Sequence, residues 1–359
     1  MLKAYAKSIL RPAWGRLRSR IESIATDRTE AIGRKLSAQL QESGEDATEL
    51  KRRLDQLDGH IEAINGIVAQ QRMELDALRH SIYAPDPTAW PADETAPFMQ
   101  FSNCQSSDFY HPRYQQLCKL MAARPFFHRK QWEFVYILHQ LAEAGMLRPG
   151  MRGLGFGVGT EPLPAVFASM GVEVTATDAP VDLEGADGWH AQNQHSDNVS
   201  QLFYPDIAPN ELVRAKVSHR PCDMNHIDPS LTGYDFNWSS CCFEHLGTID
   251  KGLAFVVNAV EKTLKVSGVA VHTTEYNASS NHETVMEGGT VIFRLQDMER
   301  LGAMLRARGH EVQPFLVGPT AHALDFHVDV PPYRHNVHLK LLLAGYVSTS
   351  VGIVVRRGR

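Results

Sequence analysis

The sequence predicts an α/β fold in which a mostly parallel sheet carries one antiparallel strand near the C-terminus, preceded by an N-terminal helical coiled coil. Three observations predict it. A glycine-rich segment lies between two strand-like runs in residues 151–178, strand-like and helical runs then alternate as far as residue 356, and an apolar heptad repeat fills residues 36–83. Alternating strands and helices are typical of parallel sheets, whereas a sustained heptad repeat is typical of a coiled coil.

Composition limits the class of protein before any motif is considered. The 359 residues suffice for one large or two ordinary domains. A net charge of −5 gives no indication of a nucleic-acid partner. The five cysteines show no C-x-x-C spacing, and no apolar run reaches the roughly 20 residues of a membrane span. We therefore expect a cytoplasmic protein with reduced, buried thiols.

Residues 1–35 are predicted as a basic amphipathic helical segment. Between Met1 and Arg20 the charged side chains are all basic and alternate with apolar ones, including Trp14. Such a segment can lie on an anionic membrane surface, so contact with the inner face of the membrane is one expectation. A solvated helix that leads into the coiled coil is the alternative.

Residues 36–83 are predicted as a coiled coil whose seam advances in alternating steps of four and three residues. The seam consists of Leu36, Leu40, Ser43, Ala47, Leu50, Leu54, Leu57, Ile61, Ile64, Val68, Gln71, Leu75, Leu78 and Ile82. One helix cannot bury this stripe alone, so we expect a homo-oligomer, most simply a parallel dimer, with a trimer as the alternative. The four prolines of residues 84–97 predict a semi-rigid linker, and residues 98–359 form the second domain.

The stretch from Met151 to Asp178 predicts a nucleotide-binding unit of strand, loop, helix and strand. Its alternating glycines are Gly155, Gly157 and Gly159. Glycines let the backbone approach a ligand closely, and an acid at the end of the second strand can bind a ribose diol. Thr160 is the predicted N-cap of the helix. A dinucleotide fingerprint would have glycine or alanine there, which weakens the pyrophosphate interpretation.

The rest of the second domain reads as further helices and strands. Helices are predicted at residues 112–123, 129–144, 249–264 and 295–308, and strands at 236–242, 269–274, 311–317 and 350–356. Residues 128–130, at the start of the second helix, either face the ligand pocket or form a charged surface. Cys241 and Cys242 are predicted to lie mid-strand and to be buried.

From about Gly145 to Arg357 the chain resembles the class I S-adenosylmethionine-dependent methyltransferases. GLGFGVG resembles the glycine-rich first motif, YDFNWSSCCFEHL the passage from the fourth strand to an EH dipeptide beside the methyl group, LKVSGVAV the turn into the fifth strand, and TSVGIVVRR the antiparallel last strand. The resemblance implies a Rossmann-like sheet and S-adenosylmethionine as cofactor.

The same resemblance implies which residues bind the cofactor. They are Gly155, Gly157, Gly159, Glu161, Asp178, Asp223, Met224, Ser239 and Ser240. Asp178 would take the ribose, and Asp223 with Met224 the adenine. The family usually has an acid where this chain has Gly153, and Glu161 is the residue that could replace it in meeting the methionine ammonium.

A narrower resemblance, carried by HRKQWE, EPLPA and TSVGIVV, is to methyltransferases associated with bacterial surface-glycan assembly. It implies O-methylation of a sugar hydroxyl in polysaccharide biosynthesis. Through its basic N-terminus, the protein could contact a glycan-assembly enzyme or the membrane.

The base that this reaction requires is sought at the carboxyl edge of the sheet. His245 is preferred because imidazole titrates near neutral pH, with Glu244 and Glu275 as the other catalytic candidates. A locally hydrogen-bonded histidine at a helix start is the alternative for His245.

The sequence does not predict a metal site. Asp325, His327 and Asp329 could form one with His322 or His335, but a partly solvated strand face is favoured because the spacing fits neither zinc nor magnesium.

Two other functions remain open. A non-catalytic scaffold is suggested by Gly153. An NAD-dependent oxidoreductase is disfavoured by Thr160 and by the SSCCFEHL segment.

Overall fold

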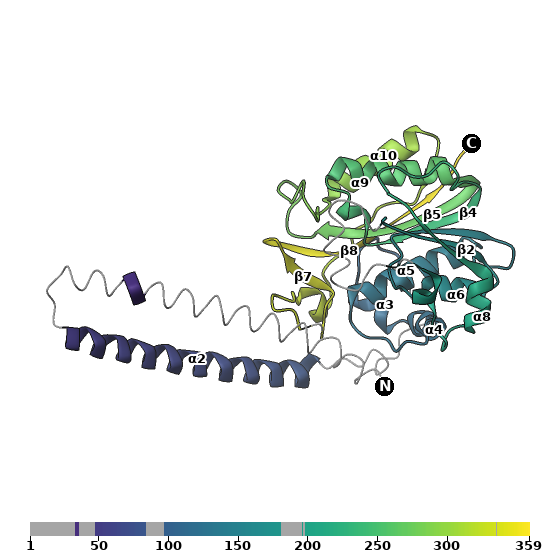
Figure 1. Ribbon diagram of the computed structural model, residues 1–359. Helices are drawn as coiled ribbons and strands as arrows, with labels where there is room; N and C mark the ends of the chain where they lie inside the picture. Colours follow the sequence, from purple (N-terminus) through teal and green to yellow (C-terminus); the bar gives the residue numbers. More distant parts are fainter. Residues whose placement is uncertain (1–32, 36–46, 84–96, 181–195, 197, 335) are drawn as a thin grey trace. The chain divides into compact units, whose positions relative to one another are not determined.

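The computed structural model describes residues 33–35, 47–83, 97–180, 196, 198–334 and 336–359 (Figure 1). The chain divides into two compact units, Met1–Ala84 and Pro85–Arg359. The predicted basic segment and the Pro-rich linker lie almost wholly outside the described residues, so both stay predictions. No described helix is long and apolar enough to cross a membrane.

The described part of the first unit is dominated by the helix α2 (Ala47–Tyr83). Apolar side chains of the predicted seam are exposed along it. They are Leu54, Leu57, Ile61, Ile64 and Val68, between 40% and 58% exposed. An apolar stripe on one side of a helix is stable in water only when another surface covers it. The predicted helix is confirmed over Ala47–Tyr83, residues 36–46 lie outside the described part of the chain, and the coiled-coil pairing stays a prediction.

The second unit is built on an eight-stranded sheet in the order β3-β2-β1-β4-β5-β8-β6, with β7 paired to β8 (Figure 1). The strands are β1 (Arg152–Phe156), β2 (Glu173–Asp178), β3 (Val217–Pro221), β4 (Tyr234–Ser240), β5 (Leu264–Asn277), β6 (Glu311–Val312), β7 (Lys340–Leu343) and β8 (Tyr346–Arg356). Strands β1 to β5 pair in parallel, and β8 runs antiparallel to β5, β6 and β7. The predicted mixed sheet is confirmed, and its order is consistent with the Rossmann-like methyltransferase fold.

Helices cover both faces of this sheet (Figure 1). They are α3 (Ser106–Tyr110), α4 (Pro112–Leu120), α5 (Arg129–Glu143), α6 (Leu163–Ser169), α8 (Asn210–Lys216), α9 (Ile249–Asn258) and α10 (Leu295–Ala307). One core joins α4, α5, α6 and α8 to Phe236 and Trp238 of β4. The other joins α9 and α10 to Leu154 and Phe156 of β1. Neighbouring strand residues face opposite layers, so both faces of each central strand are apolar.

Two predicted boundaries beside the glycine-rich loop are wrong. The helix predicted to open at Thr160 begins at Leu163, with Pro162 as its N-cap, because the Glu161 N–H bonds to the Val158 carbonyl in a preceding turn. The strand predicted at 236–242 ends at Ser240. The next residue, Cys241, takes a left-handed conformation with φ of 47° and directs the chain out of the sheet.

Gly153 and Gly155 leave space for two aromatic rings of β4. A Cβ atom at Gly153 would lie 2.4 Å from the Phe236 ring, and one at Gly155 would lie 2.4 Å from the Trp238 ring. Both rings are fully buried and pack edge-on against Phe167. The acid that the resemblance to class I methyltransferases implies at position 153 is therefore excluded here by the aromatic packing of β4.

Gly153→Asp is accordingly expected to lower the free energy of unfolding by at least about 1–3 kcal/mol, the usual cost of overpacking a core. Urea denaturation of the full chain measures it. In a Phe236→Ala background the same substitution should cost less, because the ring that it meets is gone. Equal costs in the two backgrounds would contradict the steric explanation.

Candidate functional site

A pocket of about 330 Å³ lies at the carboxyl ends of β1, β2 and β4. Its wall consists of Gly157–Pro162 after β1, Asp178 at the end of β2, Ser240–Cys242 and His245 after β4, Lys130 and Phe134 of α5, and Tyr204. The order of the sheet reverses between β1 and β4, and ligands of open α/β sheets bind outside the strand ends at such a point.

The glycine-rich loop is held open by backbone geometry and by Asp178. Gly157 and Gly159 have φ of 58° and 50°, in the left-handed region that glycine adopts readily. The Asp178 carboxylate accepts the Gly159 N–H at 3.1 Å and the Ser196 N–H at 3.0 Å. Asp178 therefore lines the pocket and at the same time fixes the loop that forms its floor.

Glu161 stands where this loop enters α6, and it lines the pocket although it is only 7% exposed. Its Oε1 accepts the Trp238 indole N–H at 2.5 Å. Burial raises the pKa of Glu161 to about 8. The indole of Trp238, which fills the space left by Gly155, thus holds the buried Glu161 carboxyl group at the pocket wall. A cation in the pocket would stabilise the charged form of this group.

His245 is the catalytic candidate that lines the pocket. Its Nδ1 lies 2.8 Å from the carbonyl oxygen of Gly289, and because a carbonyl only accepts, Nδ1 is assigned the proton and Nε2 is the basic nitrogen. Nε2 lies 3.9 Å from Oε1 of Glu244. Burial raises the pKa of Glu244, and this carboxyl group does not line the pocket.

Glu275 is buried and both of its carboxylate oxygens have partners. One pairs with the Arg129 guanidinium and the other accepts the Ser348 hydroxyl. Among the three catalytic candidates, the described geometry brings His245 to the pocket wall, places Glu244 3.9 Å from its Nε2, and holds Glu275 in an ion pair.

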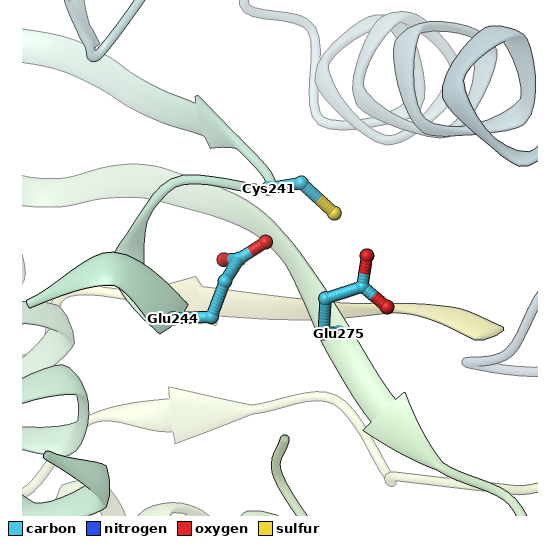
Figure 2. A group of neighbouring side chains, drawn as sticks. All are labelled: Cys241, Glu244 and Glu275. Carbon is cyan, nitrogen blue, oxygen red and sulfur yellow. The ribbon is translucent and has the colours of Figure 1, made fainter. Parts of the chain in front are cut away.

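Figure 2 shows the side chains of Cys241, Glu244 and Glu275 pointing toward one another. Their potential ligand atoms all lie within 4.8 Å of one another, close enough to hold a metal ion. However, the Arg129 guanidinium already provides a cation there, since it pairs with Glu275 and its Nη1 lies 3.8 Å from the Cys241 sulfur. Burial also raises the pKa of the Cys241 thiol, which disfavours the thiolate that a metal needs.

The other group considered for a metal does not come together in the described structure. Asp325 belongs to a 3₁₀ turn, Ala323–Phe326, rather than to the predicted strand. Its carboxylate accepts the Ser106 N–H at 2.8 Å, whereas that of Asp329 lies 2.7 Å from His338 Nδ1. His335 lies outside the described residues.

Ser239 is placed on the wrong face for the predicted cofactor contact. Its hydroxyl lies 2.7 Å from Nδ1 of His272, in the layer of α9. Consecutive strand residues point to opposite faces, so it is Ser240 that lines the pocket.

Asp223 and Met224, predicted to contact adenine, lie near the pocket but not in its described wall. The Asp223 carboxylate lies 2.7 Å from His226 Nδ1 and accepts the Asn225 N–H. The Met224 sulfur would lie 3.7 Å from a Cβ atom at Gly157, which places it beside the glycine-rich loop. Their adenine contact stays a prediction.

Sequence reasoning missed Cys241, Cys242 and Tyr204 as wall residues. The two cysteines were predicted as the last residues of the buried strand, whereas β4 ends at Ser240. The Tyr204 hydroxyl donates a hydrogen bond to the Thr160 carbonyl. The two residues are 44 positions apart, so no local pattern predicts this contact. Residues 128–130 were predicted either to face the pocket or to form a charged surface, and Lys130 lines the pocket.

No protein-family model and no curated protein matches the chain. Solved structures similar to it include three methyltransferases. Phosphoethanolamine N-methyltransferase 2 of Haemonchus contortus, in complex with S-adenosyl-L-methionine, is 14% identical over 69% of this chain and 56% of its own, with a TM-score of 0.39. The 1,6-didemethyltoxoflavin-N1-methyltransferase of Burkholderia thailandensis, with 1,6-didemethyltoxoflavin and S-adenosylhomocysteine, is 16% identical over 62% of this chain and 76% of its own, with a TM-score of 0.33. A TehB-like SAM-dependent methyltransferase of Corynebacterium glutamicum is 13% identical over 68% of this chain and 95% of its own, with a TM-score of 0.35.

Proposed function

We propose that the chain is an S-adenosylmethionine-dependent methyltransferase. The observation that carries this proposal is the convergence of Asp178, the glycine-rich loop, Glu161 and His245 on one pocket at the strand-order reversal. An acid at the end of β2 suits a ribose diol, and the open loop lets a ligand approach the backbone. A buried carboxyl group suits a cationic ligand. The motif order in the sequence supports the same cofactor.

The position of Glu161 also argues against a nicotinamide dinucleotide. A pyrophosphate binds at the N-terminus of the helix after the glycine-rich loop, where free N–H groups and the helix dipole favour negative charge. In this chain a buried carboxyl group occupies that entrance. In its ionised form this carboxylate would repel a pyrophosphate and attract the ammonium or sulfonium of S-adenosylmethionine, and those cations, unlike a pyrophosphate, would stabilise that form.

The reaction we propose is O-methylation, with a sugar hydroxyl as the acceptor. When bound, S-adenosylmethionine supplies a methyl group that the acceptor oxygen takes from the sulfonium, whose sulfur keeps the bonding electron pair. His245 Nε2 would remove the hydroxyl proton. Glu244, 3.9 Å away, would stabilise the resulting imidazolium. The sugar acceptor is supported by the resemblance to surface-glycan methyltransferases.

The exposed seam of α2 supports a further part of the proposal, that the chain acts as a homo-oligomer, most simply a dimer. A coiled coil would then hold two methyltransferase domains on one support. Contact of the basic N-terminus with the membrane or with a glycan-assembly enzyme belongs to the same proposal.

Isothermal titration of the full chain with S-adenosylmethionine, S-adenosylhomocysteine and NAD tests the function. Micromolar binding of the first two without NAD binding is the expected result. Binding of NAD alone would establish the oxidoreductase alternative. Binding of none of the three would leave the non-catalytic scaffold.

The affinity for S-adenosylhomocysteine is expected to rise with pH up to about 8. Because the pKa of Glu161 is raised to about 8, the carboxyl group must lose its proton when it meets the ligand ammonium. Each unit below that pH should therefore weaken binding by up to about tenfold. Titrations in buffers of different ionisation enthalpy measure the released proton.

Glu161→Gln is the matched control for this pH dependence, since it keeps the shape and cannot ionise. It should bind more weakly at pH 8 and release no proton from this site. An unchanged proton release in the variant would assign the effect to another group.

A further inference from the structure

Glu133 of α5 is a fully buried carboxylate just behind the pocket wall. Its Oε2 lies 2.7 Å from the Lys130 ammonium and accepts the Ser240 hydroxyl at 3.1 Å. Its Oε1 accepts the Cys241 thiol at 3.0 Å and also the Ser350 hydroxyl. Despite burial, the cations Lys130 and Arg129 lower the pKa of Glu133 to about 2, so the group stays ionised at any working pH.

Three of these partners belong to the pocket wall, namely Lys130, Ser240 and Cys241. Cys241 is a non-glycine residue in the left-handed region, a conformation that surrounding contacts must hold in place. Its N–H bonds to Thr273 and its thiol to Glu133. Glu133 therefore ties α5 to the turn that follows β4.

Lys130 is the wall residue whose position depends most on this tie. Its four-carbon side chain is 40% exposed, and an unrestrained lysine samples many rotamers. The described contacts use two of its three N–H donors, one to Glu133 and one to the Ser240 carbonyl at 3.3 Å. The third can point into the pocket, where it would donate to an anionic group of a ligand.

We propose that Glu133 is a positioning residue that fixes the Lys130 ammonium on the pocket wall, where Lys130 selects ligands that carry a carboxylate. The proposal rests on the proposed function, which gives the pocket a ligand with an amino-acid arm. Glu161, once ionised, and Lys130 then meet the ammonium and the carboxylate of that arm as a matched pair.

The test uses two ligands that differ in this arm. S-adenosylhomocysteine carries it, and 5′-methylthioadenosine does not. Titrations are run with the wild-type full chain and with Lys130→Met, Glu133→Gln and the double variant. Each single variant is expected to weaken S-adenosylhomocysteine binding about tenfold, the loss of one charge-assisted hydrogen bond, and to change 5′-methylthioadenosine binding less than twofold. The double variant should match the singles, because both remove the same contact.

Asp297→Asn is the matched control. Asp297 is also a buried acid in an i,i+3 ion pair, with Arg294 of the segment before α10, and neither residue lines the pocket. Its substitution should leave both affinities unchanged. Glu133→Asp, which keeps the charge but shortens the reach, replaces Glu133→Gln if circular dichroism shows that the latter is unfolded.

Equal losses for both ligands would show that Glu133 supports the fold only, and unchanged binding of S-adenosylhomocysteine in the variants would show that Lys130 takes no part. Either result overturns the inference while the proposed function stands. If the wild-type chain binds neither ligand, the proposed function itself fails.

Discussion

Asp178→Ala is expected to weaken S-adenosylhomocysteine binding by about 100-fold or more. The carboxylate lines the pocket at the end of β2 and would accept hydrogen bonds from the ribose, each of which contributes about 1.5–3 kcal/mol when the acceptor is charged. The substitution also removes the acceptor that holds the Gly159 N–H at 3.1 Å. Isothermal titration of the full chain at constant pH measures the loss.

Asp178→Asn separates the two contributions. The amide oxygen can still accept from the Gly159 backbone, so the loop should persist while the charge is lost, and the affinity should fall between those of wild type and alanine variant. Asp206, an acid outside the pocket wall, gives the surface control Asp206→Ala, which should bind normally. Wild-type affinity in Asp178→Ala would rule out this pocket as the cofactor site.

His245→Ala is expected to lower kcat by about 10²–10⁴-fold, the usual contribution of a positioned general base, once an acceptor has been found. Its Nδ1 bonds to the Gly289 carbonyl, which leaves Nε2 to take the acceptor proton. S-adenosylhomocysteine binding should change little, because the imidazole would act on the acceptor. The measurement is steady-state methyl transfer with the variant and the wild-type chain.

Two comparisons make this prediction specific. His282→Ala should have wild-type activity, because His282 is exposed and does not line the pocket. Added imidazole should restore part of the activity of His245→Ala. A variant that loses cofactor binding together with activity would instead assign His245 to holding the β4 turn.

Local spacing in the sequence predicted the glycine-rich loop and the acid at the end of the second strand, and the structure places Gly157, Gly159 and Asp178 in one pocket wall. The EH pair after β4 followed from the resemblance to methyltransferases, and of this pair His245 lines the pocket. The antiparallel last strand followed from the same motif order. These features depend on neighbours in sequence, and the structure keeps them together.

The phase of β4 decides whether Ser239 or Ser240 faces the pocket, and the alternation of Phe236 and Trp238 with Asn237 and Ser239 assigns Ser240 to the side of the two aromatic rings. Other features depended on information that a sequence does not display. The partners of Glu133 lie 107, 108 and 217 positions away. No local pattern predicts such a cluster, because it forms only when α5, β4 and β8 pack together.

The packing of β4 against the glycine-rich loop has a consequence for how such chains diverge. The Phe236 ring leaves room only for glycine at position 153. The indole of Trp238, which fills the space at Gly155, donates the hydrogen bond that holds Glu161. An acid at position 153 is compatible with this packing only if Phe236 is replaced by a smaller residue, so the order of the two substitutions matters. Positions 153 and 236 should therefore change together as one epistatic unit, and a motif definition that insists on an acid at position 153 would pass over a chain whose carboxyl group stands, as here, at position 161.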